Sequence, residues 1–288
     1  MIRSEEFKEQ LLKEYLMGTS QKELSEKYHT DALYQLKKLG VKRRSTGEQR
    51  IITRCGCFKL NWNCETVSNE QEAYILGMLF ADGHVCGSQL GLKLKFSDGE
   101  LVNKIKNYFS EEIKLQKDKN NRYYSFVVSS TTVVKNLSNF GLISRKSTID
   151  FHMPNIPKNL YRHFIRGYLD GDGSIYKCVV KGRPAYLKGY ICSPNISILK
   201  DFKVILLENG IDCHIDTEKR KGKSMKCFNY YVVSSTDMYR LFIRKKEALL
   251  KFYHFLYDDC TIYLNRKKKI FDDNFDMLKY IHVNTEVN

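Results

Sequence analysis

The sequence predicts a mixed α/β protein built from two similar halves, with a small all-helical module in front of them. The first observation is a repeated motif, AYILGMLFADGHV at 73–85 and HFIRGYLDGDGSI at 163–175. The second is that each copy is followed by the same series of patterns, namely hairpin, helix, hairpin and helix. Hairpin-connected strands run antiparallel. We therefore predict two αββαββα repeats with antiparallel sheets in this chain of 288 residues.

The helical module is predicted to span residues 1–47. Its first helix is followed by Ser20 and Glu23, which form a capping box at the start of a second helix. A third helix, DALYQLKKLG, ends at Gly40. This arrangement resembles a helix-turn-helix DNA-binding module, although its candidate reading helix, 30–38, is about one turn short. A small helical cap without DNA contact is the alternative.

Four segments follow the module. Residues 48–66 carry several basic residues without clear periodicity. They form either a linker that follows a phosphate backbone or an ordinary solvated one. The first repeat is predicted at 67–150, the second at 151–280, and a tail at 281–288.

The sheets are predicted to use strands at 89–97, 122–130, 184–193 and 227–235. The phrase VVSST, at 127–131 and again at 232–236, aligns the last strand of each repeat. The offset between repeats then grows from 90 at the motif to 105 at this phrase. The second repeat therefore carries about fifteen extra residues, which we place in the basic loops 177–188 and 217–226.

Side chains alternate along the first of these strands. Leu92, Leu94 and Phe96 fall on one side, whereas Lys93 and Lys95 fall on the other. One face is expected to pack against helices, and the other offers cations to solvent or to nucleic acid. Two-stranded ribbons fit the major groove of DNA.

The charge of the chain favours a nucleic-acid partner. Lys and Arg number 48 and Asp and Glu 33, so the net charge is +15, which favours binding to a polyanion. No apolar run approaches membrane-spanning length, so a membrane partner is not expected. Nine scattered cysteines and no signal-peptide pattern predict an intracellular protein rather than a secreted one. The expected location is the cytoplasm or nucleoid, or an organelle if the gene lies in an intron.

A glycine lies inside each predicted motif helix, at Gly77 and Gly167. A mid-helix glycine costs about 1 kcal/mol relative to alanine, so each implies a packing reason. Gly77 with Ala81, and Gly167 with Gly171, place small residues four apart on one helix face. Two such faces can approach backbone to backbone, so we expect the two helices to pack together.

The two motif helices end at Asp82 and Asp172. An acid in the last turn meets the negative end of the helix macrodipole and is disfavoured by about 0.3–1 kcal/mol. Its repetition predicts a cation near both helix ends, most simply a divalent metal. Two ordinary buried helices with glycine C-caps are the alternative, but they explain the glycines and not the acids.

The segments ILGMLFADG (75–83) and IRGYLDGDG (165–173) resemble the two motifs of single-chain LAGLIDADG homing endonucleases. The similarity covers roughly residues 67–275 and includes the phrases ISRKS, MPNIP and IYLNRKKKIF. It implies two pseudo-symmetric repeats in a monomer, with central motif helices and a saddle of sheets over double-stranded DNA. The implied DNA contacts are Lys93, Lys95, Tyr123, Ser125, Lys188, Tyr190, Tyr230, Arg266 and Lys267.

The resemblance also implies a metal site. Asp82 and Asp172 would ligate two or three Mg²⁺ ions, with the backbone carbonyls of Ala81 and Gly171 as further ligands and Mn²⁺ able to substitute. The product would be a double-strand break at a long recognition site, with 5′-phosphate and 3′-hydroxyl ends.

Lys95, Lys146 and Lys267 are the candidate basic residues that would orient water or stabilise charge at the phosphate. Each could instead be a phosphate contact or a surface charge. In the second repeat Ile191 aligns with Lys95, so the two pockets could be unequal and cut the two strands at different rates. A maturase that binds intron RNA, or a transcriptional regulator with an inactive core, could use the same fold and charge.

Overall fold

The computed structural model describes residues 4–16, 19–45, 59–144, 146, 149–227 and 230–279. They fall into two compact units, the first within 1–60 together with 129–131, and the second within 61–128 and 132–288. Most of the predicted basic linker, and the tail at 281–288, lie outside the described residues. None of the helices in these ranges combines the length and apolar content needed to cross a bilayer.

The first unit contains three short helices, α1 (Glu5–Leu16), α2 (Gln21–Tyr28) and α3 (Ala32–Lys38). The predicted capping box is present, because Ser20 Oγ accepts from Glu23 N and Glu23 Oε2 accepts from Ser20 N. The helices enclose a small apolar core made of Leu11, Tyr15, Leu24, Ala32 and Leu36. The order of helices is the predicted one, and DNA contact by this unit stays a prediction.

The first half of the second unit has the predicted order of elements. These are α5 (Glu70–Asp82), β1 (His84–Cys86), β2 (Gln89–Lys95), a 3₁₀ turn η1 (Phe96–Asp98), α6 (Gly99–Phe109), β3 (Gln116–Lys117), β4 (Tyr123–Ser129) and α7 (Thr131–Asn139). The strands form a sheet in the order β1-β2-β4-β3, with antiparallel β1–β2 and β3–β4 hairpins. Phe96 is exposed and belongs to η1, so the expectation that it shares the buried face of the strand is wrong. Strand β2 ends at Lys95, one residue before Phe96, so Phe96 does not take part in the buried face of the strand.

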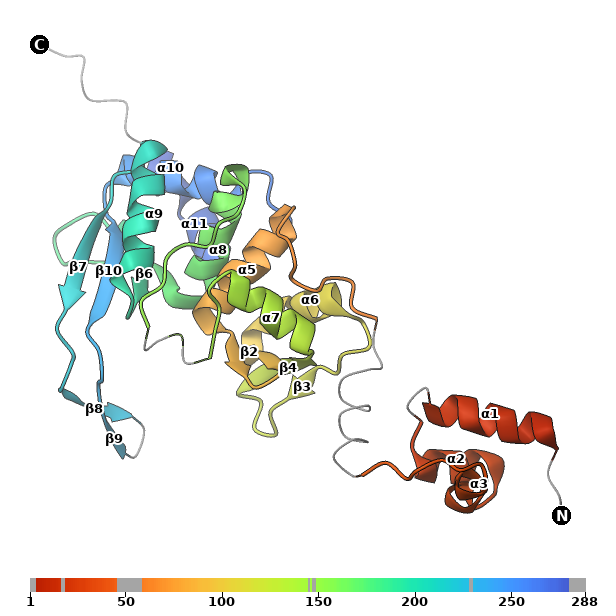
Figure 1. The fold of residues 1–288 in the computed structure, drawn as a ribbon. Coiled ribbons are helices and arrows are strands. Elements are labelled where there is room, and N and C mark those ends of the chain that lie inside the picture. Colours follow the sequence, from red (N-terminus) through yellow and green to blue (C-terminus); the bar gives the residue numbers. More distant parts are fainter. Residues whose placement is uncertain are drawn as a thin grey trace, which may run out of the picture. The chain divides into compact units, whose positions relative to one another are not determined.

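The second half repeats this order with an insertion. Its elements are η3 (Lys158–Leu160), α8 (Tyr161–Asp172), β5 (Gly173–Cys178), β6 (Tyr186–Ser193), α9 (Ile196–Glu208), β7 (His214–Glu218), β8 (Ser224–Cys227), β9 (Tyr230–Val233), β10 (Met238–Ile243), α10 (Lys246–Tyr257), α11 (Asn265–Asp272) and α12 (Phe275–Lys279). The main sheet has the order β5-β6-β10-β7. Strands β8 and β9 form a separate two-stranded ribbon beyond β7 and β10 (Figure 1).

The predicted strand at 227–235 is wrong as a member of the second main sheet. The strand that pairs with β6 and β7 is β10, whereas β9 pairs only with β8 among the described strands. The repeated VVSST phrase therefore does not mark equivalent positions. A short β-branched phrase suits many strands, but the inward face of the sheet needs the buried Leu241 and Ile243 of β10.

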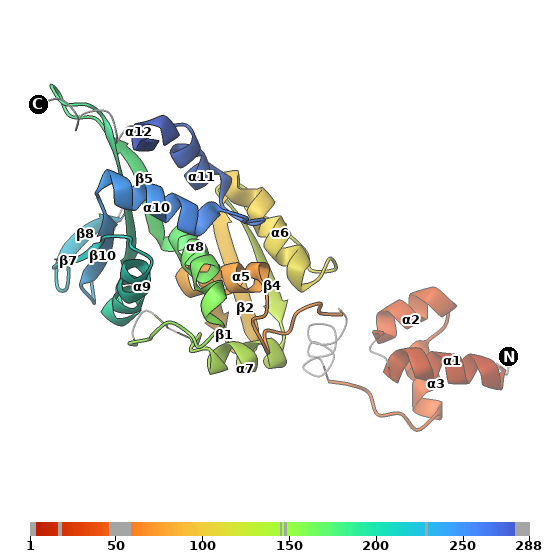
Figure 2. The same ribbon diagram turned by 90° about the horizontal axis from the view of Figure 1, so that it is seen from above.

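The two motif helices, α5 and α8, lie side by side at the centre of the second unit, between the two main sheets (Figures 1 and 2). Helix α6 packs on β2 of the first sheet, and α9 and α10 pack on β6 of the second. The architecture confirms the predicted mixed α/β fold of two repeats. It also brings the carboxyl ends of both motif helices to the centre of the molecule.

Candidate active site at the ends of the central helices

The contact between α5 and α8 is closest at two glycines. A Cβ atom added at Gly77 would lie 2.0 Å from the carbonyl oxygen of Phe164, and one at Gly167 would lie 2.0 Å from that of Tyr74. Real Cβ atoms do not approach backbone this closely, so only glycine permits the observed spacing. The reciprocal contacts reflect the pseudo-symmetry of the two helices.

The same close packing continues to the helix ends, where it brings two acids together. A Cβ atom at Gly171 would lie 2.3 Å from Ala81 Cβ and 3.1 Å from Asp82 Oδ2. The Asp82 carboxylate therefore lies against the last turn of the opposite helix, which ends at Asp172. In the part of the chain that the structure describes, neither the Asp82 nor the Asp172 carboxylate accepts a hydrogen bond.

The environment of the two acids disfavours their charged forms. Burial, and then the negative charge of Asp82, raise the pKa of Asp172 to about 6. Burial also raises the pKa of Asp82, opposed chiefly by the positive charges of Lys146 and Lys267. Two adjacent carboxylates that accept no hydrogen bond from the described residues form a site that attracts further cations.

Two lysines, the half-buried Lys146 and the buried Lys267, cap the motif helices at their negative ends. Lys146 Nζ donates to the carbonyl oxygens of Leu79 at 2.7 Å and Ala81 at 2.8 Å. Lys267 Nζ donates to those of Leu169 at 2.6 Å and Asp170 at 2.7 Å. Burial lowers the pKa of both lysines to about 8, although the neighbouring aspartates oppose the shift. Part of the cationic charge predicted at the helix ends is therefore supplied by the protein itself.

The predicted metal-ligating carbonyls take part in this capping. Ala81 O accepts from Lys146 Nζ, and Gly171 O lies 3.5 Å from Lys267 Nζ. A carbonyl oxygen has two lone pairs, so a lysine bond leaves one for another partner.

The site fits a hard divalent cation. Its side-chain donors are the oxygens of Asp82 and Asp172, and Mg²⁺ commonly uses one or two carboxylates together with water and phosphate oxygens. Within the described ranges, no group of three or more His, Cys, Asp or Glu side chains is placed to hold a metal. The remaining ligands would therefore be carbonyl oxygens, water and a bound phosphate.

Comparison with known proteins agrees with this geometry. A family model described as the LAGLIDADG-like domain matches residues 159–255. The LAGLIDADG homing endonuclease I-GzeII, in complex with its DNA target, is 13% identical with a TM-score of 0.50, and the match covers 76% of this chain and 94% of that one. The fold is that of the LAGLIDADG homing endonucleases.

A second structure agrees, because I-LtrWI bound to target DNA is also 13% identical with a TM-score of 0.50. That match covers 75% of this chain and 93% of that one. No curated protein matches the chain.

The two LAGLIDADG motifs differ at the position two residues before the terminal aspartate. Phe80 of the first motif packs against Phe151 and Phe164. Asp170 of the second is buried, and its Oδ2 accepts from Tyr74 Oη at 2.7 Å and from Leu264 N at 2.8 Å. Burial raises the pKa of Asp170 to about 6. Asp170 thus fixes the backbone at Leu264. Phe80, at the matching position of the first half, has no carboxylate to do the same.

Strand register corrects the alignment of Lys95 with Ile191. In the second half, Gly173 pairs with Ile191. In the first half, His84 pairs with Gly91, so the antiparallel register places Gly83, the equivalent of Gly173, opposite Leu92. The counterpart of Ile191 is therefore Leu92, a buried residue like Ile191 itself. By the same register Lys93 corresponds to Cys192, whose Sγ donates to the Asp172 carbonyl at 2.9 Å. The two halves therefore carry different residue types at this pair, and unequal catalytic pockets stay a prediction.

The open face of the first sheet carries the predicted DNA-contacting side chains. Lys93 and Lys95 are exposed on β2, and Tyr123 and Ser125 are partly exposed on β4. Lys93 Nζ lies 4.7 Å from the centre of the Tyr123 ring, which shows that these two side chains share a face. Of the three predicted catalytic lysines, the structure places Lys146 and Lys267 against the motif helices and Lys95 on the sheet.

The open face of the second sheet is more aromatic. Lys188 and Tyr190 are partly exposed on β6, with Lys188 over the ring of Tyr186. Arg240 of β10 lies over Tyr190, with 5.4 Å between Cζ and the ring centre. Sequence reasoning missed Arg240 because it assigned the neighbouring segment to the sheet. The apolar run Leu241–Ile243, which the structure buries, was the available signal in the sequence.

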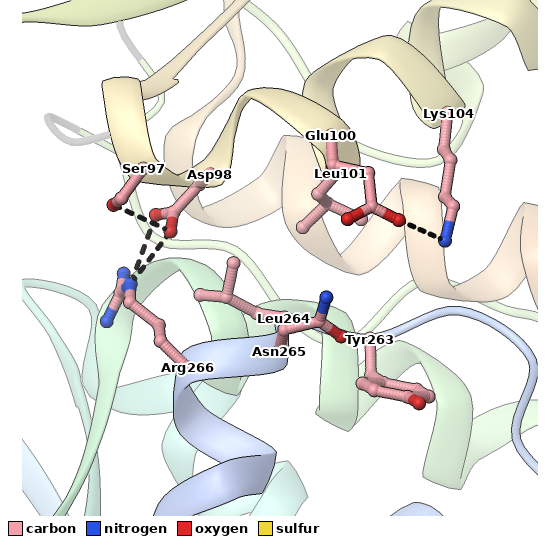
Figure 3. Close-up of a pocket in the computed structure, with 9 residues that line it drawn as sticks. All are labelled: Ser97, Asp98, Glu100, Leu101, Lys104, Tyr263, Leu264, Asn265 and Arg266. Atoms are coloured by element: carbon pink, nitrogen blue, oxygen red, sulfur yellow. Dashed lines mark hydrogen bonds and ion pairs between the residues drawn. The ribbon is translucent and has the colours of Figure 1, made fainter.

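Three predicted DNA contacts lie in other surroundings. Tyr230 lies on β9 of the ribbon rather than in the second main sheet. Arg266 Nε donates to both carboxylate oxygens of Asp98 at 3.1 Å, as Figure 3 shows. Lys267 is 2% exposed, so its ammonium faces the α8 terminus and not open solvent.

Proposed function

We propose that the protein is a site-specific DNA endonuclease that makes double-strand breaks by metal-dependent phosphodiester hydrolysis. The observation that carries the proposal is that Asp82 and Asp172 meet at adjacent helix ends, and that their carboxylates accept no hydrogen bond within the described chain. The DNA-bound state of I-GzeII and I-LtrWI, which share the fold, supports duplex DNA as the substrate. The net charge of +15 supports the same partner.

Asp82 and Asp172 would hold Mg²⁺, with Mn²⁺ able to replace it. Bound there, the cation would neutralise charge on the scissile phosphate and lower the pKa of a bound water. Lys146 and Lys267 would fix the helix ends and add positive charge beside the phosphate. The exposed lysines and tyrosines of β2 and β4 would contact the DNA backbone and base edges.

Because the two halves supply one motif acid each, a single chain would address both strands and act as a monomer. The helical unit within residues 1–60 is proposed to add a further DNA contact. An intracellular location follows from this function.

The decisive experiment is cleavage of a randomised duplex-DNA library by wild type and by Asp82→Asn/Asp172→Asn, with Mg²⁺ or Ca²⁺. We expect cutting of a long, defined subset by wild type with Mg²⁺ and a loss of at least 100-fold in the double variant. Selective binding without cutting would identify a regulator with an inactive core. Binding of a structured intron RNA in preference to duplex DNA would identify a maturase.

A further inference from the structure

Each half of the LAGLIDADG core is followed by a segment that carries one of the capping lysines. The first crossing segment comprises the described residues within 142–150 and carries Lys146. The second crossing segment comprises residues 261–268 and carries Lys267. Each lysine caps the motif helix of its own half, but the residues beside it are held by the opposite half.

The second crossing segment is held mainly by charged groups of the first half. Arg266 Nε lies 3.1 Å from both oxygens of Asp98, which is 5% exposed and precedes α6. The Thr261 amide and hydroxyl donate to Glu70 of α5 at 2.7 and 2.9 Å. Figure 3 shows Arg266 reaching from the start of α11 to the 3₁₀ turn that holds Asp98.

The first crossing segment is held by neutral donors of the second half. Asn195 Nδ2 donates to Ile149 O at 3.1 Å, and Ser197 Oγ donates to Asp150 Oδ2 at 2.8 Å. Asn195 precedes α9 just as Asp98 precedes α6. The same place in each half thus anchors the lysine segment of the other half, with an ion pair in the second crossing segment and, among the described residues of the first, with hydrogen bonds from neutral donors.

We propose that Asp98 is a positioning residue that acts through Arg266 to hold Lys267 against the end of α8. The inference rests on the proposed endonuclease function only for its catalytic consequence. Arg266 and Lys267 are adjacent, so a fixed Arg266 restricts where the Lys267 backbone can lie. Lys267 Nζ meets the carbonyls of Leu169, Asp170 and Gly173 within 2.7 Å, a geometry that tolerates little movement.

The first test measures the position of Lys267 without DNA or metal. Wild type, Asp98→Asn and Arg266→Gln are treated with an amine-acetylating reagent, and the acetylation rate of each lysine is followed by peptide mass spectrometry. We expect Lys267 to be protected in wild type and to be acetylated about tenfold faster in both variants. Each variant loses the charged hydrogen bond between Asp98 and Arg266, so the segment around Lys267 should open more often. Unchanged protection of Lys267 in both variants would overturn the proposal.

Internal controls separate local release from loss of fold. Lys106 of α6 is 6% exposed and donates to Glu111 O at 2.9 Å, so it should stay protected in every variant. If Asp98→Asn also exposes Lys106, then Arg266→Gln, which leaves α6 intact, decides the outcome. Ser197→Ala loosens the first crossing segment instead and should leave Lys267 protected.

The second test measures the catalytic consequence on a DNA target selected from the library. Asp98→Asn and Arg266→Gln should slow one strand more than the other, so that nicked plasmid accumulates, and the double variant should be no slower than either single one. Equal slowing of both strands, or additive losses, would contradict the assigned role. If wild type cuts no DNA, the endonuclease proposal fails while the acetylation result still stands.

Discussion

Arg166 Nη2 of α8 lies 2.7 Å from Glu70 Oε1 of α5, and the Arg166 side chain is completely buried. The guanidinium also donates to the carbonyls of Leu256 and Ile262, so several of its donors are satisfied inside the protein. This ion pair joins the two halves at the end of the motif helices far from the acids.

Loss of the Glu70 charge should destabilise the protein strongly. Glu70→Gln leaves the buried Arg166 guanidinium without its counter-charge, and breaking such a pair costs about 3–5 kcal/mol. We expect a fall of that size in the free energy of unfolding measured by urea denaturation. The control is Glu100→Gln, which breaks the exposed pair with Lys104 and should cost less than about 1 kcal/mol. Equal effects of the two substitutions would contradict the importance of burial.

The glycines of the helix contact make a second prediction. Gly77→Ala and Gly167→Ala each place a methyl group 2.0 Å from a backbone carbonyl of the partner helix. Overpacking of this kind costs about 1–3 kcal/mol or more, which exceeds the gain of about 1 kcal/mol in helix propensity. We expect a lower thermal midpoint for both. Asn103→Ala on the exposed side of α6 is the control, and a stable Gly167→Ala protein would refute the close approach.

Metal binding should depend on pH through Asp172. Its pKa is raised to about 6, and a metal ligand must be deprotonated, so affinity is full above this pKa and falls below it. Titration calorimetry of DNA-free protein with Mn²⁺ should show affinity about tenfold weaker at pH 5 than at pH 7.5. Asp172→Asn should bind weakly at both values. A wild-type affinity that does not change between them would count against this ligand.

Lys93 should contribute to DNA affinity by contacting a backbone phosphate, and it should have no role in catalysis. Lys93→Ala removes one exposed cation from the open face of β2, so it should weaken binding uniformly across sequences. The slope of log K against log salt should fall by about 0.9 for one lost phosphate contact. Fluorescence anisotropy at several salt concentrations measures this slope. Lys200→Ala, exposed on α9, should leave it unchanged, and an unaltered slope for Lys93→Ala would place that lysine away from DNA.

Local patterns predicted the motif helices and the first sheet well, because glycine spacing and alternating burial act over a few residues. Gly77 and Gly167 predicted a close contact between the two helices, and Leu92 and Leu94 predicted a buried face on the strand. The second sheet was assigned less well, because the phrase VVSST satisfies strand propensity at more than one place. Only pairing with β6 distinguishes β10 from β9, and pairing is not a local property.

Ion pairs between residues far apart in the chain could not be predicted from the sequence. Arg266 was predicted to contact DNA because it lies in a basic phrase, and its partner Asp98 is 168 residues away. Nothing in either local sequence marks the pair. The capping role of Lys146 and Lys267 was likewise visible only as two matched basic phrases, since their acceptors are backbone carbonyls that every residue possesses.

The crossing segments have a consequence for the order in which the molecule is completed during synthesis. Asp82, Asp172 and Lys146 emerge from the ribosome well before Lys267, yet Asp98 receives Arg266, and Glu70 its two Thr261 donors, only when the second crossing segment arrives. A prematurely terminated chain would hold both motif acids but leave Asp98 without Arg266 and the α8 terminus without Lys267. Under the proposed endonuclease function, such incomplete chains would cut DNA poorly, which would protect a genome from translation products that lack only their last tenth.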